Sequence, residues 1–241
     1  LPSLQWFLKM DELAKKAISA VKKGEIKFHP QNWEKIYLNW LENIHDWNIS
    51  RQIWWGHKIP LEGENDVLDT WFSSALWPFA ALGWPTACQQ SQKSKVKSQK
   101  NICEPIPGSD LEQFYPTQIL STARDIINLW VARMVYSGLE LTGEKPFTDV
   151  IIHATILTKE GKRMSKSLGT GIDPMILIEK YGADAVRFGL IWQAMGGQDI
   201  HWDETAVVAG KKFANKVWNI ARFILQQTNN PQLTIDKLQL K

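Results

Sequence analysis

The sequence predicts an α/β protein in which a parallel sheet with flanking helices is followed by a helical C-terminal region. Two apolar runs, residues 117–121 (TQILS) and 149–153 (DVIIH), are typical of strands, and a helical stretch at 125–141 lies between them. Strand, helix and strand at this spacing indicate a parallel unit with a crossover helix. Residues 203–227 then have the length and the apolar spacing of a long bundle helix.

The segment before the first of these strands predicts two helices. Apolar residues recur among lysines over 11–23, which is the spacing of an amphipathic helix that Gly24 would end, and 25–29 looks like a short extended link. Pro30 opens a second helical pattern over 31–44, which is rich in aromatic and aliphatic residues. We expect both helices to be packing elements.

A third region combines tryptophans with breaks in periodicity. Residues 46–60 predict a loop plus a strand, 66–68 a buried strand, and 69–82 a tryptophan-rich helix or turn that Pro78 interrupts. Residues 86–110 contain the tract QQSQKSKVKSQK, which has almost no apolar side chains to bury. We therefore expect an exposed or disordered insertion there.

The C-terminal third carries helix boundaries that can be read from single residues. Asp173 is a good N-cap, Pro174 suits the first helical position, and Gly182 fits the position just beyond the end. These residues predict a helix over 174–181, and a second helix is expected directly afterwards, over 183–191.

Composition and cysteine usage exclude several classes of protein. The 241 residues are 44% hydrophobic, enough for a sizeable core, and a net charge of +3 means that nucleic-acid contacts must come from local patches. Cys88 and Cys103 lie in a polar region without a CxxC pair, which argues against a disulfide framework and a zinc knuckle and predicts a reducing, cytoplasmic compartment. No apolar run reaches the ~18 residues of a membrane span. Because the chain begins at Leu1, we expect it to be a piece of a longer protein.

The stretch 161–171 (GKRMSKSLGTG) is the strongest candidate for a functional site. Its glycines allow the backbone to move, and the cations Lys162, Arg163 and Lys166 could neutralise a charged leaving group. Lysines and glycines are also common in ordinary surface turns, which is the simpler interpretation of the composition. The position of the stretch after a predicted strand and before a helix favours a ligand site, because α/β proteins place ligands there.

Residues 163–167 (RMSKS) resemble the KMSKS signature of class I aminoacyl-tRNA synthetases, with arginine in the first position. Five further motifs are similar to the valyl-tRNA synthetase family, in that family's order: NWLENIHDWNISRQIWWGHKIP, DVLDTWFSSALWPFAALGWP, DIINLWVARM, YGADAVRFGL and GQDIHWDE. The resemblance covers the chain from Gln5 to about Ile224, and the stretch around DVLDTWFSS favours this family over the sister isoleucyl and leucyl families.

The resemblance implies the second half of a Rossmann-like nucleotide-binding domain, followed by a helical stem-contact region and the start of the anticodon-binding bundle. The expected domains are a helical connection from the editing insertion (1–45), the C-terminal catalytic half (46–180), the stem-contact region (181–203) and the start of the bundle (204–241). The N-terminal catalytic half, with its HIGH signature, and the editing domain are expected outside this chain. We therefore expect the isolated chain to be inactive.

The family reaction activates valine with ATP, which Mg²⁺ accompanies, and transfers the valine from valyl-adenylate to tRNA(Val). The protein contributes mainly positioning and charge stabilisation. The resemblance implies that Lys166 contacts the departing phosphates and that Arg163 keeps the charge of the usual lysine in a planar fork. Lys162 and Ser165 are expected to help bind ATP.

The resemblance assigns roles to four residues outside the loop. Asp125 matches an aspartate that bonds a ribose hydroxyl or the substrate ammonium, although it would also suit the N-cap of the long helix. Trp71 and Trp130 look like walls of the valine pocket, whereas core packing is the simpler role in a chain with 13 tryptophans. His153 is expected to contact ATP, and His57 to support the fold.

Other features limit these assignments. Ser167 is expected to bond its own backbone, and no contact is assigned to Thr170, because the family usually has asparagine there. Between two motifs the family commonly carries a longer insertion, sometimes a zinc knuckle, and only 61–65 remain here, so we expect no zinc. The alternative function is a non-catalytic RNA-binding or assembly module, either a free-standing fragment or a split subunit that needs a partner half.

Overall fold

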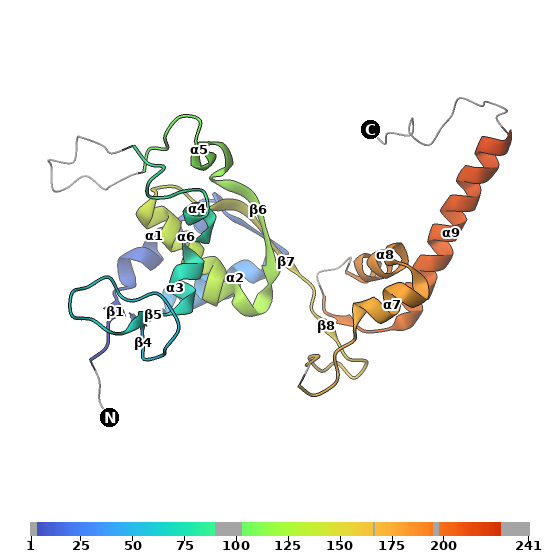
Figure 1. Ribbon diagram of the computed structural model, residues 1–241, viewed down its shortest axis with the longest axis horizontal. Coiled ribbons are helices and arrows are strands. Elements are labelled where there is room, and N and C mark those ends of the chain that lie inside the picture. Colours follow the sequence, from blue (N-terminus) through green and yellow to red (C-terminus); the bar gives the residue numbers. More distant parts are fainter. Residues whose placement is uncertain (1–3, 90–102, 166, 195–197, 228–241) are drawn as a thin grey trace. The chain divides into compact units, whose positions relative to one another are not determined.

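The computed structural model describes residues 4–89, 103–165, 167–194 and 198–227. The chain divides into two compact units, Leu1–His153 and Ala154–Lys241 (Figure 1). The loop at 161–171 therefore packs in the same unit as the later helices. The domain bounds expected from the sequence stay a prediction.

A three-stranded parallel sheet forms the centre of the first unit. Its strands are β2 (Lys27–His29), β7 (Phe147–His153) and β6 (Thr117–Ala123), in the order β2-β7-β6. The pairing of β6 with β7 confirms the predicted parallel unit. Residues 25–29, expected as an extended link, supply the third strand.

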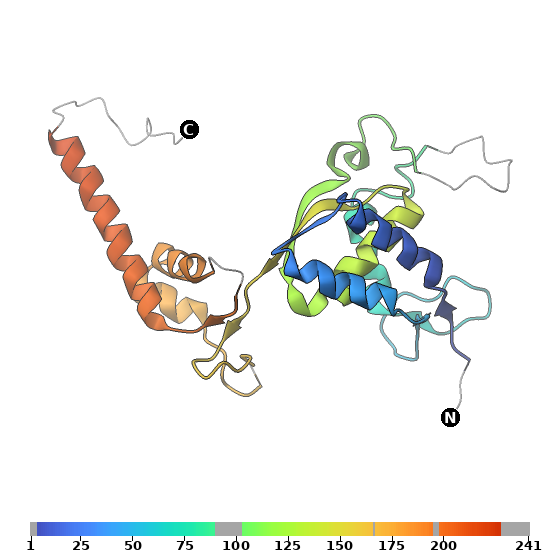
Figure 2. The same ribbon diagram turned by 180° about the vertical axis from the view of Figure 1, so that it is seen from behind.

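Helices cover one face of this sheet: α1 (Asp11–Lys22), α2 (Asn32–Glu42) and α6 (Ala132–Leu141). Val150 and Ile152 of β7 are buried in the core that these helices share with the sheet, because alternate side chains of a strand point to the same face. Figure 2 shows α1 and α2 side by side, as their contacts require.

The helical stretch after β6 is less regular than predicted. It starts with a 3₁₀ turn, Arg124–Ile126, continues as a π-helical turn, Ile127–Val131, and becomes α-helical only in α6. The cap position is held by Ala123, so Asp125 is not the N-cap of the helix. Single π-helical turns of this kind often occur at functional sites.

Short elements complete the first unit and agree with the predicted loops, strands and broken helix. Two antiparallel pairs join segments far apart in the sequence, and three short helices lie in the connections. These elements are β1 (Phe7–Leu8) with β3 (Trp47–Asn48), β4 (Ser50–Arg51) with β5 (Val67–Leu68), α3 (Thr70–Ala75), α4 (Trp77–Ala80) and α5 (Asp110–Phe114).

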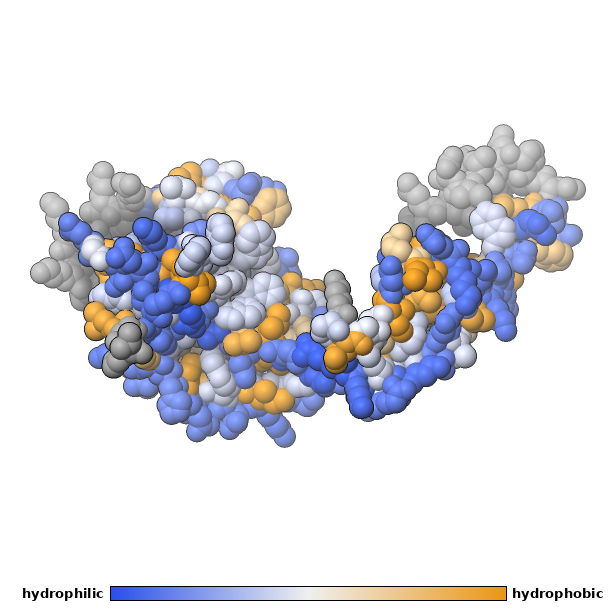
Figure 3. All heavy atoms as spheres, turned by 60° about the horizontal axis from the view of Figure 1, so that its bottom comes forward, coloured by the Kyte–Doolittle hydropathy of each residue, from blue (hydrophilic) through white to orange (hydrophobic). Residues whose placement is uncertain are grey.

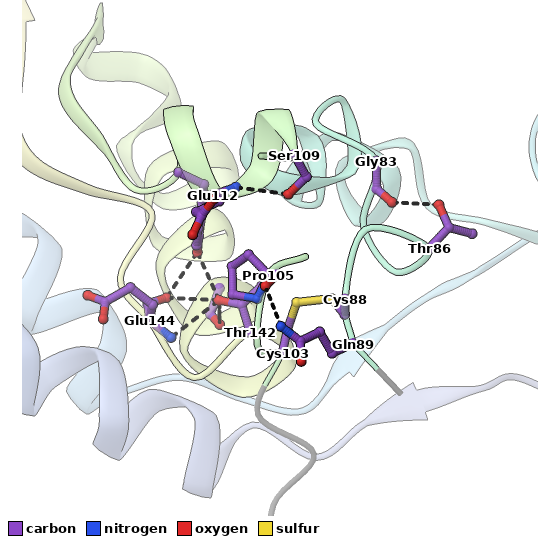
Figure 4. The surroundings of a disulfide bond; sticks show 12 residues. Gly83, Thr86, Cys88, Gln89, Cys103, Pro105, Ser109, Glu112, Thr142 and Glu144 are labelled. Atoms are coloured by element: carbon purple, nitrogen blue, oxygen red, sulfur yellow. Dashed lines mark hydrogen bonds between the residues drawn. A yellow bond between two sulfur atoms is a disulfide. The ribbon is translucent and has the colours of Figure 1, made fainter. Parts of the chain in front are cut away.

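Cys88 and Cys103 form a disulfide, so the expectation from the sequence was wrong on this point (Figure 4). Residues 90–102 lie outside the described part of the chain. The flanks then pair, with the Gln89 amide donating to the Glu104 carbonyl oxygen at 2.8 Å. This pairing brings the two cysteine Cα atoms to 5.3 Å, a distance that a disulfide spans.

The second unit combines a small parallel strand pair with three helices. The strands are β8 (Ile156–Leu157) and β9 (Ile200–His201), and the helices are α7 (Pro174–Tyr181), α8 (Ala183–Gln193) and α9 (Glu204–Gln227). The three predicted helices are confirmed. The largest difference is at the end of α8, which extends two residues beyond the predicted end.

Single residues set the helix ends and the helix spacing in this unit. The Asp173 carboxylate accepts the Met175 amide at 2.9 Å, which confirms the predicted cap, and Gly182 ends α7 with a φ of 94°. A Cβ added to Gly210 of α9 would lie 2.6 Å from the Ala185 carbonyl oxygen of α8. Glycine at this position therefore allows the two helices to approach closely.

The helices of the second unit also expose apolar side chains, visible as orange surface in Figure 3. On α9 these are Phe213, Val217, Trp218, Ile220, Phe223 and Ile224. Among the described residues, no helix has both the length and the apolar character that crossing a lipid bilayer requires.

Candidate functional site

The loop that resembles KMSKS begins as a tight hairpin next to β8. Leu157 and Arg163 form an antiparallel bridge, and the Thr158 amide donates to the Lys162 carbonyl oxygen at 2.7 Å. Gly161 makes the turn with a φ of 77°, a conformation that other residues rarely adopt. The side chains of Lys162 and Arg163 are left exposed, which is what a phosphate-binding role requires.

An apolar side chain directly before Ser165 anchors the loop to the second unit. Met164 packs against the core of the second unit, which includes Leu177, Val186 and Trp202. The residues on either side of it, Arg163 and Ser165, are therefore held at a fixed place on the surface of that core. Lys166 lies outside the described residues, so its phosphate contact stays a prediction.

Thr170 closes the serine-containing part of the loop. Its hydroxyl accepts the Ser165 amide at 2.9 Å, and its own amide donates to the Ser165 carbonyl oxygen at 3.1 Å. The Ser167 hydroxyl lies 2.8 Å from the Ser165 hydroxyl. It therefore bonds a side chain, whereas we expected it to bond its own backbone. Thr170, to which the sequence assigned no contact, thus has a defined local role.

An acidic residue moderates the charge at the entrance of the loop. The Thr158 hydroxyl bonds the Glu160 carboxylate and lowers the pKa of that carboxyl below its ordinary value of 4.5. Glu160 therefore stays ionised near neutral pH beside Lys162. The cations of 159–166 outnumber this carboxylate, so the loop remains basic.

In the first unit, Asp69 determines how Trp71 is placed. The Asp69 carboxylate is buried and caps α3 by accepting the Trp71 amide at 2.8 Å. Its second oxygen accepts the Trp47 indole N–H at 3.3 Å and an ion-paired hydrogen bond from Arg51. Three donors from separate segments therefore converge on one carboxylate beside the candidate substrate tryptophan.

Trp71 lines a cavity of 530 Å³ whose wall combines aromatic side chains with polar and charged ones. The guanidinium of Arg133, itself 8% exposed, lies 4.0 Å from the centre of the Trp47 ring. Burial raises the pKa of Tyr136, so this phenol stays neutral. Other lining residues include Trp40, Asn48, Arg51 and Asp69.

Trp130 lies against the same short helix as Trp71 but does not line this cavity. Its indole N–H donates to the Ser74 carbonyl oxygen of α3 at 3.0 Å, and its ring packs against the core of the first unit. Trp130 therefore has a structural role, the core-packing role that is the simpler interpretation of its sequence. That the two tryptophans form the walls of one valine pocket stays a prediction.

Asp125 and His153 both lie at the carboxyl edge of the parallel sheet. His153 ends β7 in register with Ala123, the last residue of β6, and Asp125 follows in the 3₁₀ turn. This edge is where parallel α/β sheets bind ligands. His57 lies elsewhere, in an exposed loop where its carbonyl oxygen accepts the Leu68 amide at 2.8 Å, in keeping with support of the fold.

The predicted site residues therefore fall into two groups. Trp71, Trp130, Asp125 and His153 belong to the first unit, whereas Lys162, Arg163 and Ser165 belong to the second. Within the described residues, no group of His, Cys, Asp and Glu side chains is arranged to hold a metal ion.

Sequence reasoning missed Asp69, Arg51, Trp47 and Thr170. The signal for Asp69 was present, because an aspartate directly before the helical run TWFSSA is typical of an N-cap. No comparable signal identified Arg51 or Trp47, which reach Asp69 from a different part of the chain. Thr170 could be recognised only from the closed loop.

The chain matches the family model described as tRNA synthetases class I (I, L, M and V) over residues 2–65 and 60–203. It is 48% identical over 250 residues to the valine–tRNA ligase of Clostridium tetani, covering 92% of this chain and 26% of that protein. It is 44% identical over 261 residues to the valine–tRNA ligase of Bacillus subtilis, covering 99% of this chain and 27% of that protein. The chain thus spans about a quarter of the length of these relatives.

Solved structures show the same fold. The methionyl-tRNA synthetase of Mycobacterium tuberculosis in complex with methionyl-adenylate superposes with a TM-score of 0.67 at 20% identity, covering 85% of this chain and 36% of that one. Because the identity is low, this likeness concerns the fold alone. It agrees with the Rossmann-like, parallel α/β architecture expected from the sequence.

Proposed function

This chain belongs to the class I tRNA synthetases (I, L, M and V), and we propose that it is the part of a valine–tRNA ligase that supplies the second half of the catalytic domain. The reaction is the ATP-dependent activation of valine to valyl-adenylate, followed by transfer to tRNA(Val). The observation that carries the proposal is the identity of 44–48% to valine–tRNA ligases along nearly the whole chain.

The basic loop of the second unit binds the phosphates of ATP in this proposal. Lys166 and Arg163 stabilise the charge that grows on the departing pyrophosphate, while Lys162 and Ser165 help to hold the nucleotide, which arrives with Mg²⁺. The exposure of Lys162 and Arg163 and the anchoring of Met164 in the core support this assignment. A hydroxyl of Ser165 and three cations suit a polyphosphate better than a neutral ligand.

In this proposal the candidate residues of the first unit bind the amino acid and the nucleoside. Trp71 and Trp130 contact the valine side chain, Asp125 bonds the substrate ammonium or a ribose hydroxyl, and His153 contacts ATP. The hydrogen bond from the Trp130 indole to the Ser74 carbonyl oxygen of α3, the helix that contains Trp71, supports a role for both tryptophans near one substrate. The position of Asp125 and His153 at the carboxyl edge of the sheet supports their contact with nucleotide.

The chain covers only about a quarter of the length of its relatives, so other parts of the protein should complete the enzyme. We expect an N-terminal catalytic half and an editing domain to complete the enzyme, with domain bounds at 1–45, 46–180, 181–203 and 204–241. The isolated chain should therefore show no valine-dependent exchange of pyrophosphate into ATP. Robust exchange by the isolated chain would contradict this division of the site.

The decisive experiment is a chimaera in which this chain replaces the matching segment of the Bacillus subtilis valine–tRNA ligase. We expect valine-dependent pyrophosphate exchange that isoleucine and methionine do not support. A chimaera that melts cooperatively but shows no such exchange would overturn the proposal, as would a preference for another amino acid.

Substitution of the loop lysine refines this test. Lys166→Ala should lower the exchange rate roughly 100-fold, since one lost donor to a developing charge costs about 3 kcal/mol. Lys212→Ala, which removes an exposed lysine of α9, serves as the matched control and should leave exchange unchanged. Equal loss in the two variants would remove Lys166 from the reaction.

A further inference from the structure

A histidine of β9 supports the tight turn of the basic hairpin. The Nδ1 atom of His201 lies 3.3 Å from the Lys159 carbonyl oxygen. Because a carbonyl oxygen can only accept a hydrogen bond, the ring nitrogen is the donor. A Cβ added to Gly161 would lie 3.0 Å from His201 Cε1, so the imidazole also packs directly against the turn. One side chain of β9 thus contacts two residues of the turn.

The hydrogen bonds inside the hairpin join its own residues to one another. The Thr158 amide donates to the Lys162 carbonyl oxygen at 2.7 Å, and the Gly161 amide donates to the Thr158 carbonyl oxygen at 3.0 Å. These two bonds close the turn, but they do not connect it to the rest of the second unit. The His201 bond, in contrast, connects the turn to β9.

The main chain at His201 is held independently of the histidine side chain. The Ile200 amide donates to the Thr155 carbonyl oxygen at 2.9 Å, and the Trp202 amide donates to the Leu157 carbonyl oxygen at 2.9 Å. Trp202 is also buried in the core of the second unit. The strand that carries His201 is therefore a firm support, and a change of side chain at this position leaves the strand pairing in place.

The position of the turn matters because Lys162 follows Gly161 directly. The Lys162 side chain is exposed, and its main chain starts from the residue that packs on the imidazole. Where the main chain is already held, a bound ligand has to order only the lysine side chain, so binding costs less conformational entropy. Support of the turn should therefore strengthen the binding of a ligand by Lys162.

We propose that His201 is a positioning residue for ATP binding: its hydrogen bond to the Lys159 carbonyl oxygen fixes the turn and, through it, the main chain of Lys162. The identity of the ligand rests on the proposed function. The support of the turn is a separate claim about this chain. His201 acts through the turn, and no contact between its ring and the substrate is part of the proposal.

The first experiment tests the support on the chain as it stands, without any substrate. His201→Ala removes the ring, and His201→Asn keeps a side-chain N–H. We expect the Gly161 amide to exchange its hydrogen about fivefold faster in His201→Ala and at nearly the original rate in His201→Asn. Unchanged exchange in His201→Ala, or equal acceleration in both variants, would overturn the support by this hydrogen bond.

Gln193→Ala is the matched control for this experiment. It also removes a side-chain N–H that donates to a main-chain oxygen of the second unit, that of Gly189 at 2.9 Å, but this bond lies within α8. The control should leave exchange of the Gly161 amide unchanged. If it accelerated this exchange as much as His201→Ala does, the effect would be general loosening of the unit and the proposal would be wrong.

The second experiment tests positioning in the Bacillus subtilis chimaera. His201→Ala should raise the KM for ATP in pyrophosphate exchange about fivefold and leave the KM for valine unchanged, because the turn serves the nucleotide. His201→Asn should recover the KM for ATP, and Gln193→Ala should change neither KM. A loss of folded enzyme would lower kcat and leave both KM values as they were, so the KM for ATP distinguishes positioning from a general structural role.

The outcomes separate the two proposals. If the unsubstituted chimaera exchanges pyrophosphate and His201→Ala keeps the original KM for ATP, positioning by His201 is wrong and the proposed function stands. An equal rise in the KM for ATP and for valine would also contradict positioning, because the turn and the candidate valine residues belong to different units. An unsubstituted chimaera that folds without activity overturns the proposed function and the positioning role together, whereas amide exchange still decides whether His201 holds the turn.

Discussion

Asp69→Ala should destabilise the first unit, because three hydrogen-bond donors meet on this side chain. The substitution removes the N-cap of α3, which typically costs about 1 kcal/mol. It leaves the partly buried Trp47 indole N–H without its acceptor, for about 1 kcal/mol more. The Arg51 side chain is 39% exposed, so loss of its ion pair adds below about 1 kcal/mol.

These contributions sum to between about 2 and about 3 kcal/mol, which corresponds to a fall of roughly 4–12 °C in the melting temperature of a unit of this size. Near-ultraviolet circular dichroism of the tryptophans follows the transition. Asp69→Asn keeps an oxygen for the Trp71 amide and should lose less. Asp66→Ala removes a less buried carboxylate that bonds Gln52 and should change the melting temperature little. A melting temperature for Asp69→Ala within 2 °C of the original, or equal losses for Asp69→Ala and Asp66→Ala, would refute the reasoning.

Three further changes test other parts of the chain. The Cys88–Cys103 disulfide closes a separation of 15 residues, so its reduction should destabilise the chain by about 3 kcal/mol in thermal melts. The Cys88→Ser, Cys103→Ser double variant should not respond to reductant. Gly210→Ala should loosen the second unit and speed its proteolysis, because the new methyl would lie 2.6 Å from a main-chain oxygen of α8. Gly171→Ala is the control and should leave the rate of proteolysis unchanged, because its new methyl would have no atom within 4 Å. Hydrogen bonds from a lysine and a tyrosine of α7 lower the pKa of Glu204 in the folded protein. The ionised Glu204 therefore stabilises the folded state fully above the unfolded pKa of about 4.5. This stabilisation is lost as the pH falls through the lower pKa of the folded state. In acid titrations, Glu204→Gln should therefore weaken the pH dependence of unfolding in this range.

The sequence could predict those elements whose signals are local. The strand, helix and strand over 117–153 follow from periodicity, and Asp173 with Gly182 marks α7 because caps depend on neighbouring residues only. The irregular start of the helix after β6 was not predictable in this way. Its turns at 124–131 are 3₁₀ and π-helical, and the α-helical period of apolar residues does not describe either of them.

For the candidate site, motifs in the sequence suggest residues but not the contacts that hold them, and the roles of those residues stay predictions. Motif position identified Trp71 and the basic loop, whereas the contacts that hold them depend on tertiary structure. Arg51 reaches Asp69 across 18 positions of sequence, and the Cys88–Cys103 pair joins two residues that are 15 positions apart. Such contacts become visible only when the chain path is known.

The two groups of site residues are held with different stiffness, and the reason lies in their solvent exposure. The Asp69 carboxylate is 5% exposed, so breaking its bonds leaves polar groups that water reaches poorly. The bonds between Thr170 and Ser165 lie at the surface, where water replaces each broken bond and the net value of a bond is about 1 kcal/mol. These bonds therefore open at a lower energetic cost than those of Asp69, and we expect faster amide hydrogen exchange at Ser165 than at Trp71.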